Sequence, residues 1–488
     1  MQSKDETPPR KQSFLRSSVT LLVAERLLLV FFGAGVALLF FFSALSSSLC
    51  TVLPNPIPTP LPTIVHHRPP LAPPTAPHRP LPVATTAPRP PLSTVSHRRD
   101  SRKDHDRRRS STRATFYDDP SLSYTIDRPI ANWDSKRREW LRLNPSLATP
   151  DRVIMVTGSP PGRCPNPGGD HLLLRFYKNK ADYCRLHGYD LFYNTALLHP
   201  EMPGCWAKIP LVRAAMVAHP ESEWVWWVDQ DAAFTDMEFR PPFHRYRAHH
   251  LVVPGWPYMV YTARDWVGLN AGVFLLRNSQ WGLDFLDAWA SMGPQTPHHA
   301  KWGRVLDAEI RGKLTSFADD QSALVHLLAK EQRRWRDKVH LESGYDLHGY
   351  WEPIVGRLED VAAAYAEMER RDAVLRRRHA EKEAGSYGET RNRYLDAAAG
   401  GGGEKGSGKW RGRKRRSFVT HFTGCQPCGG AHNPAYTWEG CVDGMARALN
   451  FADDQVLRAY GFGHTNLNDS ASIRPLPFGF PASSRGGR

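Results

Sequence analysis

Runs of apolar residues and their spacing predict alternating strands and helices over most of the chain. Residues 224–228 (WVWWV) are continuously apolar, which is typical of a central strand covered on both faces. The β-branched run at 152–157 leads into Gly-Ser-Pro-Pro, which predicts a parallel strand followed by a loop. One helix face is predicted by apolar residues at Trp281, Phe285, Trp289 and Met292. This alternation predicts a single α/β domain over 126–481 and a short disordered tail at 482–488.

The N-terminal region has a different pattern. Residues 27–45 contain no charge, and at about 1.5 Å per residue such a helix is about 28 Å long, close to the hydrocarbon thickness of a bilayer. Basic residues precede this run, and no charged residue follows it before Arg68. We therefore expect a cytosolic tail at 1–26, a membrane helix that acts as a signal anchor, and type II topology. A cleaved signal peptide or a buried helix is the alternative, although a signal peptide has a shorter apolar core.

Residues 46–125 are rich in Pro and basic residues, and no Phe, Trp or Tyr occurs between 51 and 115. Such a segment cannot bury enough apolar surface to fold, so we expect a disordered, extended stem. A second unusual region, 358–416, interleaves strong helix formers with opposite charges and contains a glycine run. It is predicted to be an insertion that forms a solvent-exposed helical hairpin or one long helix, followed by a flexible loop.

The net charge of +15 lies mostly outside the predicted core. Residues 98–113 hold eight basic and three acidic residues, and residues 405–416 hold seven basic residues and no acidic one. These two stretches carry 12 of the 15 net charges, so the remaining chain is nearly neutral. A nucleic-acid partner is therefore not expected. The mean hydropathy of −0.48 excludes a polytopic membrane protein.

The cysteines indicate an oxidising compartment. Six of the seven would lie on the lumenal side of the predicted anchor, and an even number there favours disulfides over thiols. Their pairing stays open; the six are Cys164, Cys184, Cys205, Cys425, Cys428 and Cys441. The Cys-x-x-Cys pair at 425–428 has no second pair or histidine pair at zinc spacing, which argues against a zinc site. Asn468 begins the one usable sequon and is the predicted glycosylation site.

The strongest chemical signal is Asp229-Gln230-Asp231, directly after the buried strand at 224–228. In a strand, residues i and i+2 point to one side, so we expect the two carboxylates to meet. Carboxylates at the carboxyl end of a buried strand suit Mg²⁺ or Mn²⁺ and, through it, a diphosphate. The spacing alone is weak, because residues 104–106 in the stem repeat it without any such context.

Eight blocks between about 150 and 465 resemble one family, the plant glycosyltransferases of family 34. This family includes xyloglucan xylosyltransferases and galactomannan galactosyltransferases. The blocks are 156–161 (VTGSPP), 179–188 (NKADYCRLHG), 206–208 (WAK), 226–231 (WWVDQD), 269–272 (LNAG), 289–294 (WASMGP), 318–322 (ADDQS) and 420–428 (THFTGCQPC). The resemblance implies a GT-A fold, a retaining mechanism, a UDP-sugar donor and Mn²⁺ as cofactor.

The resemblance also implies roles for individual residues. His421 would complete a metal site with Asp229 and Asp231, and Mn²⁺ accepts imidazole together with carboxylates. Lys208 would offset charge on the leaving diphosphate, unless it is an ordinary surface lysine. The nucleotide-sugar would be held by Gly158, Ser159, Asp229, Asp231, Asn270 and Gly272.

Three parts of this assignment allow another explanation or depart from the family pattern. A tight turn explains Gly272 as well as a close-packed sugar does. Asp319-Asp320-Gln321 precedes a predicted helix at 322–328, so either Asp could be its N-cap. The resemblance implies instead that this motif lies beside the transferred sugar, with Gln321 opposite the leaving group. Gln230 departs from the usual Ser, and we expect its side chain to point away from the metal.

The expected function is that of a Golgi type II membrane enzyme with a lumenal catalytic domain. The segments 376–382, 425–434 and 475–478 resemble the galactomannan galactosyltransferase branch. That branch implies α-galactose transfer from UDP-galactose to the 6-position of a β-1,4-linked mannan or glucomannan. A xyloglucan α-1,6-xylosyltransferase using UDP-xylose is the alternative, and a catalytically inactive polysaccharide-binding scaffold is another.

The acceptor chain could stack on aromatic side chains, although core packing would explain the same residues. The candidates are Trp256, Tyr258, Tyr350 and Trp351. Assembly into homo-oligomers, or with other enzymes of wall synthesis, stays open.

Overall fold

The computed structural model describes residues 128–149, 151–198, 202–376, 381–400 and 415–477. The predicted tail, membrane helix and stem lie outside these residues, as do most of the basic run at 405–416 and the tail at 482–488. Among the helices of the described part, none is both long and apolar enough to span a bilayer.

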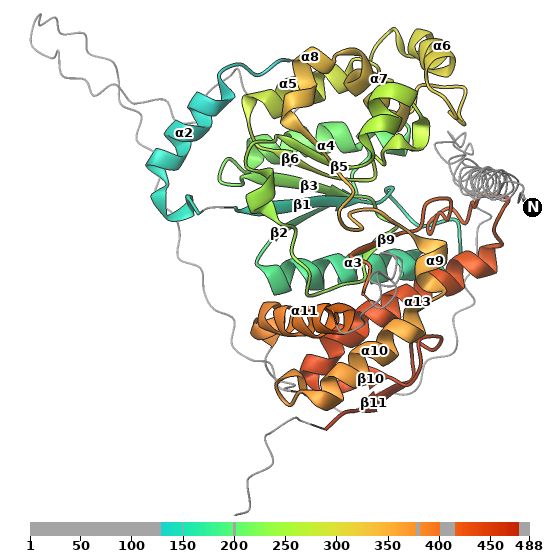
Figure 1. Ribbon diagram of the computed structural model, residues 1–488. Helices are drawn as coiled ribbons and strands as arrows, with labels where there is room; N and C mark the ends of the chain where they lie inside the picture. Colours follow the sequence, from blue (N-terminus) through green and yellow to red (C-terminus); the bar gives the residue numbers. More distant parts are fainter. Residues whose placement is uncertain (1–127, 150, 199–201, 377–380, 401–414, 478–488) are drawn as a thin grey trace, which may run out of the picture. The chain divides into compact units, whose positions relative to one another are not determined.

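A six-stranded mixed sheet forms the centre of the protein (Figure 1). The strand order is β2-β1-β3-β6-β5-β7, and β6 alone runs antiparallel to its neighbours. The strands are β1 (Val153–Gly158), β2 (Asp190–Asn194), β3 (Trp224–Val228), β5 (Leu251–Pro254), β6 (Val273–Arg277) and β7 (Val339–Glu342). Every residue of β3 is buried, which confirms the predicted central strand. The predicted α/β class is confirmed as well.

Helices cover both faces of this sheet (Figure 1). On one face lie α4 (Lys208–Ala218), α5 (Gln280–Ala290) and α7 (Asp320–Lys330), and on the other lies α3 (Gly169–His187). The predicted apolar helix face is found in α5, where the rings of Trp281 and Phe285 stack with centroids 5.1 Å apart. The helix ends at Ala290, so Met292 follows it, although its side chain is still buried.

A second, three-stranded sheet joins distant parts of the chain. It has the order β4-β9-β8 and consists of β4 (Ala232–Phe234), β9 (Val419–His421) and β8 (Gly349–Tyr350). In the antiparallel pairing of β4 with β9, Ala232 lies opposite His421. The segment that follows β3 is thereby fixed against the C-terminal part of the domain.

The remaining elements of the described part lie around these sheets. The helices are α2 (Trp133–Leu143), α6 (His299–Glu309), α8 (Gln332–Trp335), α9 (Trp351–Val355), α10 (Leu358–Arg371), α11 (Ala384–Gly400) and α13 (Trp438–Leu457). A π-helix spans Tyr258–Ala263, and β10 (Phe462–His464) pairs with β11 (Ile473–Pro475) as a C-terminal hairpin. Short 3₁₀ turns link several of these elements, as at Trp266–Gly268.

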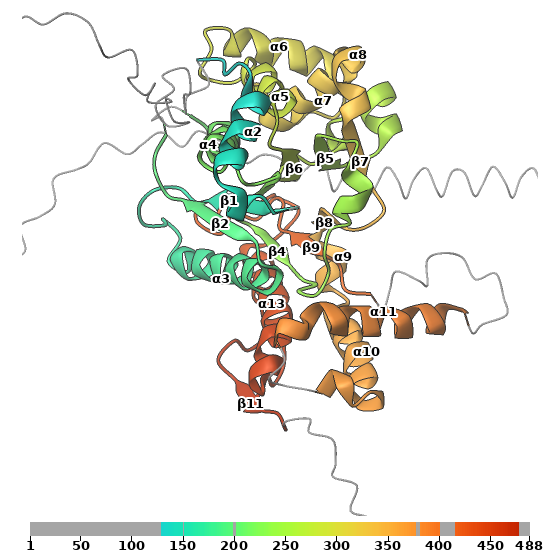
Figure 2. The same cartoon turned by 90° about the vertical axis from the view of Figure 1, so that its left-hand side faces the viewer.

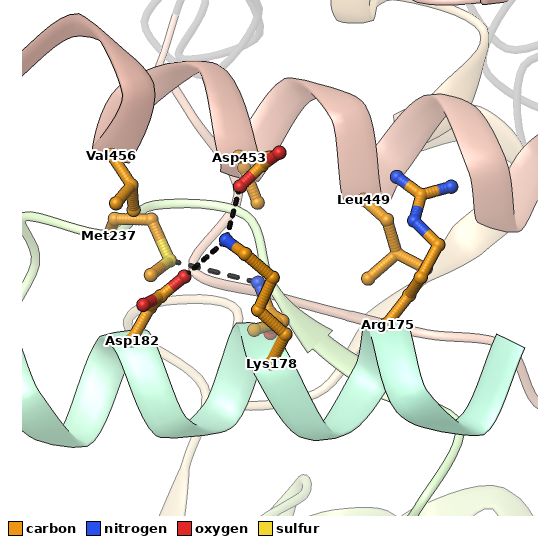
Figure 3. A pocket seen from close by; sticks show the side chains of 9 residues that line it. Arg175, Lys178, Asp182, Met237, Leu449, Asp453 and Val456 are labelled. Atoms are coloured by element: carbon orange, nitrogen blue, oxygen red, sulfur yellow. Dashed lines mark hydrogen bonds and ion pairs between the residues drawn. The ribbon is translucent and has the colours of Figure 1, made fainter. Parts of the chain in front are cut away.

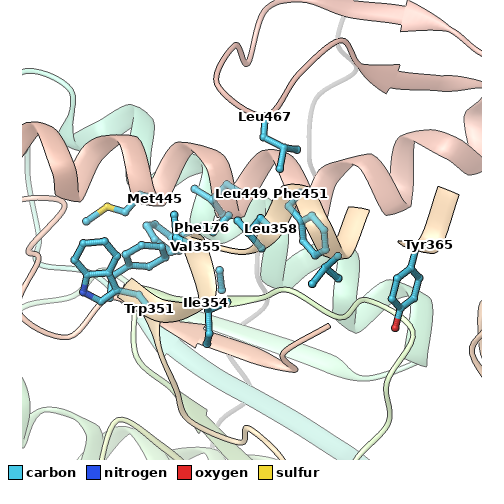
Figure 4. Close-up of a cluster of buried hydrophobic side chains, with 14 of the residues drawn as sticks. Phe176, Trp351, Ile354, Val355, Leu358, Tyr365, Met445, Leu449, Phe451 and Leu467 are labelled. Carbon is cyan, nitrogen blue, oxygen red and sulfur yellow. The ribbon is translucent and has the colours of Figure 1, made fainter. Parts of the chain in front are cut away.

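In the described part of the charged region 358–416, the helices are not solvent-exposed and are not one long helix, so that expectation is wrong; the predicted loop lies outside the described residues. The described part forms α10 and α11, which lie with α13 on the far side of α3 from the central sheet (Figures 1 and 2). Leu358, Val361, Tyr365 and Met368 form one stripe along α10 and pack in a core with α13 (Figure 4). Charged residues fill the other positions of the helix and hide this stripe in the sequence.

Ion pairs add to the packing around α3 and α13. Lys178 of α3 lies between Asp182, at 2.6 Å, and Asp453 of α13, at 2.5 Å, beside a shallow pocket (Figure 3). Within the charged region, Arg391 of α11 and Arg416 both pair with Glu238. The C-terminal helices are therefore an integral part of the domain.

Disulfides fix the segment around the C-terminal Cys-x-x-Cys pair. Cys428 bonds to Cys164, and Cys425 bonds to Cys441. The two cysteines of the pair thus have different partners, which leaves neither as a thiolate for zinc. Cys205 is disulfide-bonded as well.

The expectation of disulfides at all six lumenal positions is wrong for Cys184. Its thiol is free and buried, with Sγ 3.7 Å from Met155 Sδ. Burial raises the pKa of this thiol to about 12. The thiol packs against β1 in the apolar core, where a small hydrophobic side chain suffices.

The pairing can be checked by alkylation. In denaturant without reductant, Cys184 should be modified, because unfolding returns its pKa to the ordinary value of about 8.5. The four cysteines of the two mapped disulfides should stay unmodified until reductant is added. Peptide mapping by mass spectrometry reads out each site. Alkylation of Cys425 or Cys441 before reduction would contradict the pairing, and native protein is the protected control.

Candidate active site

Asp229 and Asp231 lie in a turn at the carboxyl end of β3. The turn closes through a hydrogen bond from Ala232 N to Asp229 O of 3.2 Å, and Asp229 N donates to Gly272 O at 2.8 Å. The carboxylates converge as predicted but for another reason. The strand ends at Val228, so the turn and not a strand face brings them together.

His421 closes the site from the second sheet. Its Nε2 lies 3.2 Å from Asp231 Oδ1 and 3.9 Å from Asp229 Oδ2, and one ligand atom from each residue lies within 4.8 Å of the others. His421 Nδ1 is buried and has no hydrogen-bond partner among the described residues. Two carboxylates and an imidazole nitrogen in this arrangement fit a divalent cation, and this donor set suits Mn²⁺ well.

Gly272 leaves room for these three side chains. A Cβ atom added at this position would lie 2.5 Å from Asp229 Oδ2 and closer still to His421 Cε1. Gly272 does not have a positive φ, so the turn does not require glycine here. Space for the side chains of Asp229 and His421 is therefore the reason. Asn270 supports the same segment, because its Oδ1 accepts a hydrogen bond from Gly272 N at 2.9 Å.

Lys208 connects the three candidate metal ligands to the Asp-Asp-Gln motif. Its Nζ is buried, 2.7 Å from Asp320 Oδ2 and 3.5 Å from Asp229 Oδ1, and it donates to Ala271 O at 3.0 Å. Burial alone would lower the pKa of Lys208, but Asp229 and Asp320 raise it above the ordinary value. Burial raises the pKa of Asp320 to about 6. Lys208 is thus a buried charged residue of the site and not a surface lysine.

Asp319 is the N-cap of α7, as one of the two interpretations of the motif allowed. Its Oδ1 accepts hydrogen bonds from Ser322 N at 2.8 Å and from Trp266 Nε1 at 3.1 Å, and its Oδ2 accepts one from Thr315 Oγ1 at 2.9 Å. Asp320 is the carboxylate of the motif that reaches Lys208. Asp319 therefore caps the helix, whereas Asp320 forms the ion pair with Lys208.

Gln321 holds two backbone segments together. Its Oε1 accepts a hydrogen bond from Ala271 N at 3.1 Å, and its Nε2 donates to Trp266 O at 2.9 Å. The motif is thereby joined to the segment that carries Asn270 and Gly272. A role opposite the leaving group stays a prediction.

Gly158 and Ser159 lie at the carboxyl end of β1, the strand next to β3. A Cβ at Gly158 would lie 2.5 Å from Asn194 O, so the close approach of β2 already requires glycine there. Ser159 N donates to Asn194 O at 3.0 Å. Their contact with a nucleotide stays a prediction. The Gln230 carboxamide Oε1 is buried without a hydrogen-bond partner among the described residues.

Three residues at the site were not singled out from the sequence. Trp227 Nε1 donates to Asp229 Oδ1 at 2.6 Å, and the ring of His348 meets that of His421 edge-on at 4.9 Å. Lys180 of α3 lies beneath the Asp229 turn and is fully buried. The sequence indicated the burial of Lys180, because this residue shares a helix face with Phe176 and Tyr183.

The candidate aromatic residues separate into two groups. Trp351 is buried and stacks on Phe422 at 5.5 Å, and Tyr350 is half-buried and bonds through its hydroxyl to Tyr436. Core packing therefore explains both. Trp256 and Tyr258, by contrast, are 54% and 71% exposed.

The profile of the galactosyl transferase GMA12/MNN10 family, which is glycosyltransferase family 34, matches residues 149–432. The chain belongs to this family. It is therefore a glycosyltransferase, and the resemblance seen in the sequence is confirmed.

Curated relatives in plants agree with this assignment. Galactomannan galactosyltransferase 1 of Cyamopsis tetragonoloba is 56% identical over 372 residues, which cover 76% of this chain and 82% of that protein. Probable glycosyltransferase 7 of Oryza sativa subsp. indica is 58% identical over 375 residues, again 76% and 82%. Glycosyltransferase 6 of Arabidopsis thaliana is 53% identical over 369 residues, 75% of this chain and 83% of that protein.

Likeness to solved structures is weak. A glycosyltransferase involved in glycosylation of the major capsid of PBCV-1 is 15% identical, with a TM-score of 0.29 over 41% of this chain and 85% of that one. A value this low supports no conclusion about the site.

Gly272→Ala tests the space requirement. The added methyl group should displace His421 or Asp229 and weaken Mn²⁺ binding by about 10-fold or more. Gly204→Ala is the matched control, because no atom lies within 4 Å of its added Cβ. Titration of the purified full-length chain with Mn²⁺, followed by electron paramagnetic resonance of the free ion, gives the affinity. Equal affinities in the two variants would contradict the assigned site.

Proposed function

We propose that this family 34 member is a Mn²⁺-dependent, retaining galactosyltransferase. It moves galactose from UDP-galactose to the 6-position of a β-1,4-linked mannan or glucomannan. The observation that carries the proposal is the convergence of Asp229, Asp231 and His421 beside the buried Lys208–Asp320 pair. The 56% identity to a galactomannan galactosyltransferase supports the choice of donor and acceptor.

Each residue of the site has a specific task in this proposal. Asp229, Asp231 and His421 Nε2 hold Mn²⁺, which when bound supplies a Lewis acid for the diphosphate of the donor. Lys208 holds Asp320 and Asp229 at fixed positions and contributes a buried positive charge to the pocket. Asn270 and Gly272 provide the polar and open wall beside these groups.

The hydrogen bonds of the motif favour a front-face transfer without a covalent intermediate. Asp319 is used as the helix cap, Asp320 is paired with Lys208, and the Gln321 amide bonds to two backbone groups. Each of these three side chains already has a bonding partner, so none is free to attack C1 of the sugar as a nucleophile. In the proposed step, the bond from C1 of the sugar to the UDP oxygen breaks. The new bond from C1 to O6 of the acceptor forms on the same face, and the O6 proton passes to that UDP oxygen.

The acceptor chain would lie on Trp256, which follows β5, and on Tyr258, which begins the π-helix; this segment is joined to the site. Asn270 N bonds to Pro254 O at 3.1 Å, and Trp256 N bonds to Gly268 O at 2.9 Å. Trp256 therefore lies two residues beyond Pro254, the hydrogen-bond partner of Asn270, at about 3.3 Å per residue along the strand direction. Exposed aromatic side chains beside a polar site are typical of ligand-binding surfaces.

The proposed location is the Golgi membrane, with type II topology and a lumenal catalytic domain. The apolar run at 27–45 and the basic residues before it support this orientation. Disulfides at Cys164–Cys428 and Cys425–Cys441, together with the exposed sequon residue Asn468, fit an oxidising lumen. Proteolysis of intact vesicles tests the orientation, since digestion of the catalytic domain from the cytosolic side would contradict it.

Asp231→Asn removes one charge from the proposed metal site without changing its shape. Transfer should fall by about 100-fold or more, because the diphosphate would lose its bound cation. Thermal stability in chelator should not fall, since two adjacent carboxylates repel each other in the absence of metal. Asp104→Asn, in the stem motif of equal spacing, is the control. Mn²⁺-dependent activity that survives in Asp231→Asn would contradict the site.

Donor and acceptor can be separated in one experiment. The full-length chain with Mn²⁺ is supplied with UDP-galactose or UDP-xylose and with mannohexaose or cellohexaose. Galactose transfer to mannohexaose should be fastest, and a site that hydrogen-bonds the extra hydroxyl can discriminate by up to about 10⁴-fold. Faster transfer of xylose to cellohexaose would instead favour the xyloglucan xylosyltransferase alternative. No transfer in any combination, with Mn²⁺ still bound, would favour the scaffold alternative.

Trp256→Ala should raise KM for mannohexaose by about 10-fold, as expected for loss of a central aromatic contact. Mn²⁺-dependent hydrolysis of UDP-galactose without acceptor should be unchanged. Tyr460→Ala, at a residue 55% exposed on the C-terminal part, serves as the control. An equal loss in hydrolysis and transfer would show that Trp256 acts on the fold and not on the acceptor.

A further inference from the structure

Lys180 is a buried lysine directly beneath the turn that carries the proposed metal ligands. It lies on α3, is fully buried, and its Nζ donates to Gln230 O at 3.1 Å and to Ala232 O at 2.7 Å. These two carbonyls belong to the residues on either side of Asp231. One side chain thus holds the backbone both before and after this ligand.

The environment of Lys180 is unfavourable for a charge. Among the described residues, no carboxylate forms a direct ion pair with its Nζ. The ring of Phe176, with its centroid 5.3 Å away, and the more distant Asp229 and Asp231 favour the charged form, but burial outweighs them. Burial lowers the pKa of Lys180 to about 7. An apolar residue of similar length would avoid this desolvation cost. The two hydrogen bonds to the turn therefore explain why a lysine occupies this position, because an apolar side chain could not donate them.

The opposite side of the same segment is held by β9. Phe422 N donates to Asp231 O at 3.1 Å, and Ala232 pairs with His421. Lys180 and the β9 backbone therefore hold three successive carbonyls, those of residues 230, 231 and 232. Such bonding fixes the peptide planes around Asp231 and with them the direction of its carboxylate.

We propose that Lys180 is a positioning residue for the metal site. It fixes the turn so that the Asp231 carboxylate meets His421 Nε2, and it does not touch the cation itself. This inference rests on the metal site of the proposed function. It concerns the geometry of one ligand and is independent of donor and acceptor.

Other side chains of α3 keep the rest of the segment in place. Asn179 bonds to both backbone groups of Phe234, at 2.9 and 2.8 Å, and His187 Nε2 contacts Met237 O at 2.9 Å. Loss of Lys180 should therefore loosen the turn without releasing β4. The change is expected at the metal site and not across the fold.

Lys180→Met tests the proposal, because methionine keeps the length and removes both hydrogen bonds. Mn²⁺ affinity of the full-length chain should fall by about 10- to 100-fold, the usual effect of losing a group that supports a metal ligand. Lys178→Met is the matched control, two residues away on the same helix with a side chain 52% exposed, and should bind Mn²⁺ as the wild type does. Electron paramagnetic resonance of free Mn²⁺ measures both.

The direction of the change separates the possible roles. Removal of a positive charge alone would tighten the binding of a cation, so tighter or unchanged affinity in a folded Lys180→Met variant would overturn the proposal. If that variant does not fold, Lys180→Gln keeps an amide donor of shorter reach and should show an intermediate loss. Wild-type affinity in Lys180→Gln would then overturn it. Failure of the wild type to bind Mn²⁺ would instead count against the metal site of the proposed function.

Discussion

The pairing of β4 with β9 is the contact on which the candidate active site depends. It places Ala232 opposite His421, so that His421 reaches Asp231 across 190 positions of sequence. Thr235 extends the contact, because its hydroxyl bonds to Ser417 O and Thr420 Oγ1, both at 2.7 Å. A shift of this register by one residue would turn the His421 side chain to the other face of the sheet and separate it from the carboxylates.

The parts of the domain outside the two sheets hold this pairing in place. The disulfides of Cys425 and Cys428 anchor the chain within a few residues of His421. α13 packs on α3, and α10 covers α13 with an apolar stripe. Ion pairs from Arg416 to Glu238 connect the end of the charged region to the segment after β4. The C-terminal half thus stabilises a site whose acidic ligands come from the middle of the chain.

Charge balance shapes the site before any cation binds. Asp229, Asp231 and Asp320 are close together, and such carboxylates repel one another in a medium of low dielectric constant. Lys208 lies between Asp229 and Asp320, and Lys180 lies below the turn that carries Asp229 and Asp231. These buried ammonium groups are costly to desolvate, and this cost is offset only because each is bonded to the site. The site is therefore organised in advance by the pairing of Lys208 with two carboxylates and by the hydrogen bonds of Lys180 to the turn.

Local patterns in the sequence determined the parts of this protein that depend on neighbouring residues. The apolar run at 224–228 specified a buried strand, and Asp229 and Asp231 after it specified paired carboxylates, although the turn that follows the strand brings them together and not a strand face. The tertiary structure alone decided which residues met across long separations. It gave Asp319 to the helix cap and Asp320 to Lys208, left Cys184 unpaired, buried the stripe of α10, and placed Lys180 under the turn. The helix cap is a local contact, but the other outcomes depend on sheet register and helix packing between segments far apart in the chain. The helix faces of α10 and of Lys180 are periodic in the sequence, yet periodicity does not show which distant segment packs against a face.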